Sequence, residues 1–162
     1  MDSSSVINLF NAGVLALLCQ LEDHDFFVPP MVVGECSGDC AVELVTLRDD
    51  GCLTFINDDA VDADQYLALL EEHRLGAGET ECMAVAATED FDVCCDDRKA
   101  RQAATGFLGE GRVMGTLRLL QLCVEELVID CAAAFDAFTT MKEKGGFLPE
   151  KQQDFFCAEG DC

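Results

Sequence analysis

Residues 91–104 read FDVCCDDRKARQAA, and this stretch decides the fold class. The apolar run FDVCC is typical of a buried strand, and it ends abruptly at Asp96 and Asp97. The following RKARQAA predicts a helix. A buried strand that passes directly into a helix belongs to an α/β fold, in which ligands bind outside the carboxyl ends of parallel strands. The aspartate pair therefore lies where a functional site is expected.

The same alternation continues on both sides of this stretch. Short apolar strands are predicted at 26–28, 52–56 and 111–116, and Gly13 is expected to break the first helical region in two. Helices are predicted within residues 3–21, 30–36, 41–51, 62–74, 78–90, 98–104, 117–127, 131–144 and 145–156. This order indicates an α/β fold with a mainly parallel sheet, and a hairpin over Asp50 and Gly51 is the alternative at that position.

The composition indicates a folded protein with a very acidic surface. Half of the 162 residues are hydrophobic, which suits a single domain over residues 1–162 with one core. The 32 acidic residues against 10 basic ones give a net charge of −22, so the protein repels polyanions at long range. Charge alone therefore does not suggest free nucleic acid as a partner.

The 11 cysteines are scattered, without the paired spacing of zinc knuckles. We expect most of them to be small buried hydrophobic residues with free thiols, in a reducing cytoplasm. Residues 3–21 carry no charge, but polar residues interrupt them and no basic residue precedes Arg48, so neither a signal peptide nor a membrane span is predicted. A Cys-rich metal or redox protein ranks last among the functional interpretations.

Five acids lie beside apolar segments, at strand ends or on the first turns of helices: Asp2, Glu35, Glu79, Asp96 and Asp97. Each alone has a structural interpretation, because an acid is favourable at a helix start. Together they can converge at one edge of the sheet, where carboxylates repel one another unless a hard cation such as Mg²⁺ or Mn²⁺ neutralises them. A metal site is the natural resolution.

The order of motifs along the chain resembles a known family. The motifs are MDSSSVINLF, PPMVVGEC, LGAGETECMAVAA, VCCDDRKAR, VMGTLRLL and GGFLP. Together they are similar to the PIN-domain family, in its branch of VapC-type, toxin-like nucleic-acid-binding proteins. The resemblance implies a three-layer sandwich, in which helices flank a central, mainly parallel sheet.

The resemblance also implies a set of site residues. The matching acids, which would be both catalytic and metal-binding, are Asp2 with Ser4 as support, Glu35, Glu79 with Glu81 as the alternative, and Asp97 with Asp96 beside it. Arg98, Lys99 and Arg101 would guide the phosphates of a substrate; the alternative is that they pair with local acids or solvate a helix.

The implied activity is that of a toxin-type endoribonuclease that depends on Mg²⁺ or Mn²⁺ and hydrolyses RNA. Its expected partners are the RNA substrate, a small antitoxin protein that holds it inactive, and a second copy in a homodimer. The second hypothesis, from another functional class, is a non-catalytic PIN-like module that binds nucleic acid or protein. The heavy acidity favours that alternative.

The start of the chain departs from the family pattern. PIN domains begin with an apolar central strand that ends at the first acid, whereas only Met1 precedes Asp2 here. We therefore expect the first strand to be missing or truncated, with Asp2 on a mobile terminus. A version extended upstream is expected to melt at a higher temperature and to bind Mn²⁺ more tightly.

Overall fold

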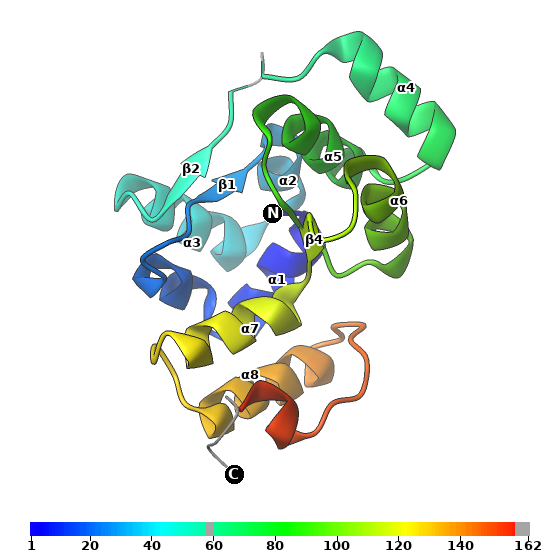
Figure 1. Cartoon of the computed structure of the whole chain (residues 1–162). Coiled ribbons are helices and arrows are strands. Elements are labelled where there is room, and N and C mark those ends of the chain that lie inside the picture. Colours follow the sequence, from blue (N-terminus) through cyan, green and yellow to red (C-terminus); the bar gives the residue numbers. More distant parts are fainter. Residues whose placement is uncertain (58–59, 158–162) are drawn as a thin grey trace.

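The computed structural model describes residues 1–57 and 60–157, in which helices and short strands alternate along the chain (Figure 1). The strands are β1 (Phe26–Val28), β2 (Leu53–Phe55), β3 (Val93–Cys94) and β4 (Val113–Met114). The helices are α1 (Ser3–Asn11), η1 (Leu15–Gln20), α2 (Pro30–Glu35), α3 (Gly38–Asp49), α4 (Ala63–His73), α5 (Ala77–Glu89), α6 (Arg98–Leu108), α7 (Thr116–Glu125), α8 (Cys131–Glu143) and η2 (Gln153–Phe156). This order confirms the predicted α/β fold.

Local sequence signals set several of the boundaries. Gly13, with a φ of 69°, separates α1 from η1 as predicted. Pro30 is the first residue of α2, where its missing N–H costs nothing. Helix α1 has Asp2 as its N-cap, whose side chain accepts a hydrogen bond from the N–H of Ser5.

The strands form two separate parallel pairs. Strand β1 pairs with β2, with Phe26 opposite Leu53, and β3 pairs with β4, with Val93 opposite Val113. The alternative hairpin over residues 50–51 is ruled out, because the segment before it is helix α3 rather than a strand. Parallel strands need a crossover, and helices α2 and α3 supply it between β1 and β2.

Met1 and Asp2 lie between the two pairs and bond to both. The amino group of Met1 donates to the carbonyl of Phe27 in β1 at 2.8 Å, and the N–H of Asp2 donates to the carbonyl of Cys94 in β3 at 2.9 Å. A cavity of about 350 Å³ continues between the pairs and is lined by residues of both. Asp2 itself is only 1% exposed, so the prediction of a mobile terminus is wrong.

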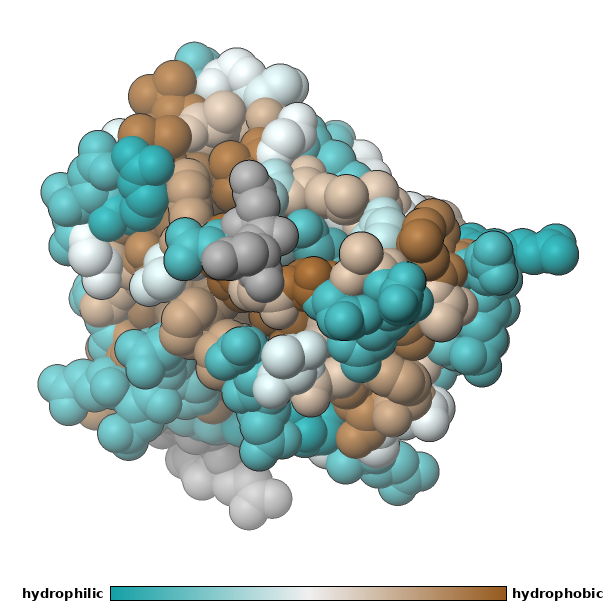
Figure 2. Space-filling model, turned by 90° about the horizontal axis from the view of Figure 1, so that it is seen from above, coloured by the Kyte–Doolittle hydropathy of each residue, from teal (hydrophilic) through white to brown (hydrophobic). Residues whose placement is uncertain are grey.

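The hydrophobic core joins these elements into one cluster. Its most deeply buried members include Val6 of α1, Leu44 of α3, Met83 of α5 and Met141 of α8. On the face seen from above in Figure 2, hydrophobic and hydrophilic residues are interspersed. Among the described residues, no helix is long and apolar enough to cross a membrane.

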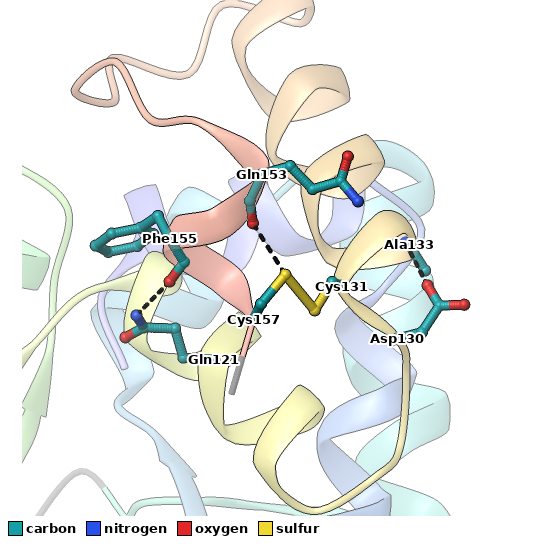
Figure 3. The surroundings of a disulfide bond; sticks show 7 residues. All are labelled: Gln121, Asp130, Cys131, Ala133, Gln153, Phe155 and Cys157. Carbon is teal, nitrogen blue, oxygen red and sulfur yellow. Dashed lines mark hydrogen bonds between the residues drawn. A yellow bond between two sulfur atoms is a disulfide. The ribbon is translucent and has the colours of Figure 1, made fainter. Parts of the chain in front are cut away.

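Two disulfides are exceptions to the prediction that most cysteines have free thiols. Cys19 is bonded to Cys52, and Cys131 at the start of α8 is bonded to Cys157 after η2. Figure 3 shows the second bond, beside which the side-chain amide of Gln121 donates to the carbonyl of Phe155 at 2.8 Å. Their sequence separations of 33 and 26 residues follow no recognisable motif, so only the fold brings the partners together.

The remaining described cysteines confirm the other part of that prediction. The free thiols are all buried: Cys36, Cys40, Cys82, Cys94, Cys95 and Cys123. Burial raises the pKa of Cys82 and of Cys94 to about 12, so both thiols are protonated at neutral pH. These cysteines serve as small hydrophobic residues of the core.

Candidate functional site

Asp2 is buried at the start of α1 with its carboxylate fixed by short-range hydrogen bonds. The hydroxyl of Ser4 donates to Asp2 Oδ2 at 2.9 Å, and the N–H of Ser5 donates to Oδ1 at 2.9 Å. Ser4 is also linked to the next acid, because its hydroxyl accepts a bond from the N–H of Asp96 at 3.3 Å. The Ser4 hydroxyl thus links the carboxylate of Asp2 to the backbone of Asp96.

Asp96 follows β3 and binds the start of α7. Its carboxylate accepts bonds from the N–H of Thr116 at 2.9 Å, from the hydroxyl of Thr116 at 2.7 Å and from the side-chain amide of Asn8 at 2.7 Å. Burial raises the pKa of Asp96, and the bonds from Asn8 and Thr116 oppose that rise. The absence of a side chain at Gly115 lets the Asp96 carboxylate lie at this position, because a Cβ on residue 115 would be only 2.8 Å from Asp96 Oδ1.

Asp97 is exposed and caps α6. Its Oδ1 accepts a bond from the N–H of Ala100 at 2.8 Å. A cavity of about 980 Å³ opens beside it, and Arg98 and Arg101 line this cavity together with both aspartates. Lys99 lies elsewhere, because its amino group donates to the carbonyl of Arg74 at the end of α4, at 2.6 Å. The structure therefore separates Lys99 from the two arginines with which it was grouped.

Glu35, the last residue of α2, reaches the start of α5. Its Oε1 accepts a bond from the N–H of Gly78 at 3.2 Å. A Cβ at position 78 would lie 2.8 Å from Glu35 Oε2, so the glycine permits the close approach. The free N–H groups and partial positive charge of the first helical turn favour a carboxylate there.

Glu79 stands on the same first turn of α5 and connects the acids electrostatically. Its Oε2 accepts a bond from the N–H of the N-cap residue Gly76 at 2.9 Å, which is the half of a capping box that a glycine N-cap allows. Partial burial raises the pKa of Glu79 most, and the negative charges of Asp97, Asp2 and Glu35 raise it further. The acids predicted to meet are thus close enough to affect one another.

Glu81 has a different setting. Its side chain is 7% exposed, and its Oε2 accepts a bond from the N–H of Met31 at 2.8 Å. Met31 lies on the first turn of α2, the helix that ends at Glu35. Glu81 therefore anchors the helix that carries Glu35, while Glu79 interacts with the other acids.

Comparison with known families assigns this chain to one of them. The family model described as DUF3368, a PIN domain, matches residues 1–158. The chain is a PIN-domain protein. The comparisons with curated proteins and with solved structures give no match. Membership of this family indicates a nuclease-type function and nucleic-acid binding, since PIN domains are generally nucleases, and the family typically uses divalent metals.

The chemistry of this PIN domain's acids suits a hard divalent cation. Asp2, Glu35, Glu79, Asp96 and Asp97 offer only carboxylate oxygens, the donors that Mg²⁺ and Mn²⁺ prefer. Among the residues that the structure describes, however, no three acidic, histidine or cysteine side chains already form a compact metal cluster. The carboxylates would therefore have to leave their present positions to bind one ion together.

Four residues of this region escaped the sequence analysis: Asn8, Gly78, Gly115 and Thr116. Asn8 is only 6% exposed within the hydrophobic face of α1, and a buried amide on an apolar face is a signal that could have been used. Gly78 and Gly115 lie within recognised motifs, but the sequence does not show why glycine is needed there. The reason is the close approach of the Glu35 carboxylate to Gly78 and of the Asp96 carboxylate to Gly115, which only the three-dimensional structure shows.

Proposed function

We propose that this PIN domain is a metal-dependent endoribonuclease of the VapC toxin type. The observation that carries the proposal is the position of the acids, which bind the N-terminal turns of α1, α5, α6 and α7. Glu79 interacts electrostatically with Asp97, Asp2 and Glu35, which supports one common site. Helix N-termini attract negative charge, so the region that holds these acids also favours a phosphate.

In this proposal the acids hold the ion and the arginines hold the substrate. Asp2, Glu35, Glu79 and Asp97 would bind one or two Mg²⁺ or Mn²⁺ ions, with Asp96 beside them. A bound ion supplies Lewis-acid stabilisation of the reacting phosphate and lowers the pKa of an attacking water. Ser4 orients Asp2 through its hydroxyl, and Glu81 anchors α2 and thereby Glu35.

Arg98 and Arg101 would bind phosphates of the RNA in the cavity beside the acids. Two other arginines are engaged elsewhere, because Arg112 is paired with Asp90 and Asp92, and Arg118 with Glu125. The guanidinium groups of Arg98 and Arg101, which form no ion pair within the described residues, suit a backbone whose charge the rest of this acidic surface repels. Lys99 would contribute to substrate binding only by leaving the carbonyl of Arg74.

The proposal includes a protein partner. A small antitoxin protein would hold the enzyme inactive in the cytoplasm, and a homodimer remains a prediction. The residues 1–162 are proposed to form one domain. The acidic site would bind a basic segment of the antitoxin through complementary charge.

The deciding variant is Asp97→Asn. Asparagine is as good an N-cap as aspartate, so α6 is retained while a charged oxygen ligand is lost. RNA cleavage in Mn²⁺ is expected to stop with EDTA and to fall by about 100-fold in the variant, since several kcal/mol of charge stabilisation are removed.

A matched control is Asp130→Asn, which alters the N-cap of α8 in the same way. This control is expected to cleave RNA like the unchanged protein. Cleavage that persists in Asp97→Asn, or that EDTA does not affect, would reject the assignment.

The second candidate function is a non-catalytic PIN-like binding module. One observation favours it: each acid already has a hydrogen-bonding role at a helix start, and the described residues form no ready-made metal cluster. A calorimetric titration with Mn²⁺, which measures the affinity of the protein for the ion, distinguishes the two functions. A protein that binds RNA but shows no Mn²⁺ affinity supports the binding module.

A further inference from the structure

The large cavity beside Asp96 and Asp97 has a second wall that the proposed chemistry does not use. Its volume is about 980 Å³, and its polar side carries the two aspartates with Arg98 and Arg101. Its apolar lining residues include Ile7 of α1 and residues 147–149. In Figure 1 the segment that follows α8 projects on the same side of the molecule as α6.

Phe147 is the most prominent residue of this wall. Its side chain is 99% exposed, and Ile7 on the neighbouring helix is 37% exposed. Single exposed hydrophobic residues are common on proteins, but these two line one cavity together with cationic side chains. An aromatic ring in that setting has a flat face available to a ligand.

The backbone on both sides of Phe147 is fixed. The N–H of Gly146 donates to the carbonyl of Met141 at 2.8 Å, and the N–H of Leu148 donates to the carbonyl of Gly146 at 3.1 Å. Gly146 also packs so closely on α1 that a Cβ there would lie 2.6 Å from Asn8 Oδ1. Because the segment is braced, presenting the ring to a ligand costs little conformational entropy.

Arg98 and Arg101 are available to the same ligand. Within residues 1–57 and 60–157, neither guanidinium takes part in an ion pair. The cavity therefore combines an aromatic face with two cationic groups, next to a site proposed to act on phosphodiesters. Proteins that bind single-stranded nucleic acid use this combination, with bases stacked on aromatic rings and the backbone following positive charge.

We propose that Phe147 forms a nucleobase-binding subsite, on which an unpaired base of single-stranded RNA stacks while Arg98 and Arg101 bind the adjacent phosphates. This inference rests on the proposed function and narrows its substrate class. A base inside a duplex has no free face, so the subsite selects single-stranded segments, loops or ends.

The test measures the binding of a fluorescently labelled single-stranded RNA hexamer by anisotropy, in EDTA so that no cleavage occurs. Phe147→Ala is expected to weaken binding about tenfold, whereas Phe147→Tyr, which keeps the ring, stays within about twofold. Val42→Ala, which removes an exposed apolar side chain from α3, is the control and should bind like the unchanged protein. A duplex of the same sequence is expected to bind weakly and equally to all variants.

Three outcomes would overturn the subsite. They are unchanged binding in Phe147→Ala, equal loss in the alanine and tyrosine variants, and dissociation of a protein dimer by Phe147→Ala without an effect on RNA. Mn²⁺ affinity and nuclease activity are measured separately on the same proteins. If the tenfold loss occurs while Mn²⁺ does not bind, the subsite is retained and the nuclease proposal fails.

Discussion

Glu79 is the residue at which the acids of the site affect one another most directly. It accepts a capping bond from Gly76, and its pKa is raised by burial and by the charges of Asp97, Asp2 and Glu35. A carboxyl group whose pKa is higher in the folded than in the unfolded state binds its proton more tightly when folded. Its contribution therefore favours folding at low pH and is lost as the pH rises through the folded pKa.

Replacing this charge tests that relation. In EDTA, Glu79→Gln is expected to raise the free energy of unfolding at pH 7 by about 0.5–1 kcal/mol, because the glutamine oxygen can still accept the bond from the N–H of Gly76 and the repulsion is removed. Below the ordinary pKa of a glutamate the variant and the unchanged protein should differ little. Urea denaturation at pH 4 and pH 7 measures both values.

Glu89→Gln at the exposed end of the same helix is the control and should show no such difference between the two pH values. A Glu79→Gln variant that is less stable at pH 7 would contradict the repulsion inferred among the acids.

At the scale of elements, helices and their ends could be predicted from the sequence where residues of a single chain segment determine them. Periodic apolar residues, Pro30 and Gly13 marked helices and breaks that the structure confirms. Features that depend on distant segments could not be predicted. The disulfide partners and the contact of Asn8 with Asp96, which are 88 residues apart, require the assembled fold.

The junction of β4 and α7 gives an element-scale prediction. Gly115→Ala would place a Cβ 2.8 Å from Asp96 Oδ1 and 3.3 Å from the carbonyl of Cys95, so Asp96 must leave the start of α7. We expect a loss of about 1–3 kcal/mol in the free energy of unfolding, as for other overpacked positions. Chemical denaturation measures this loss.

Gly106→Ala is the matched control, because nothing lies within 4 Å of its added Cβ and the residue is in the interior of α6. Alanine there is expected to stabilise the protein by about 0.5–1 kcal/mol. Equal effects of the two substitutions would show that Asp96 does not depend on the space at Gly115.

At the scale of the whole molecule, Met1 and Asp2 join the inner edges of the two strand pairs through backbone hydrogen bonds. The N–H and carbonyl groups of a parallel strand point alternately to its two sides, so those of Phe27 and Cys94 face the cavity between the pairs. An added strand of four apolar residues ahead of Met1 would pair with both edges and fill the cavity.

Such an extension is expected to raise the melting temperature by about 4–8 °C. For a chain of this size, that shift corresponds to an increase of about 2 kcal/mol in the free energy of unfolding. Calorimetry measures the shift, and an equally long Gly-Ser extension serves as the control. Equal melting of the two extended proteins would contradict the role assigned to the cavity.

The division of the strands also affects the order of folding. Each parallel pair closes within a short stretch of chain, residues 26–55 for one pair and 93–114 for the other. Short loops close at a lower entropic cost than long ones, so each pair with its crossover helices can form early and independently. Docking of Met1 and Asp2 between the pairs must then come late, which makes the completion of the acidic site one of the last steps of folding.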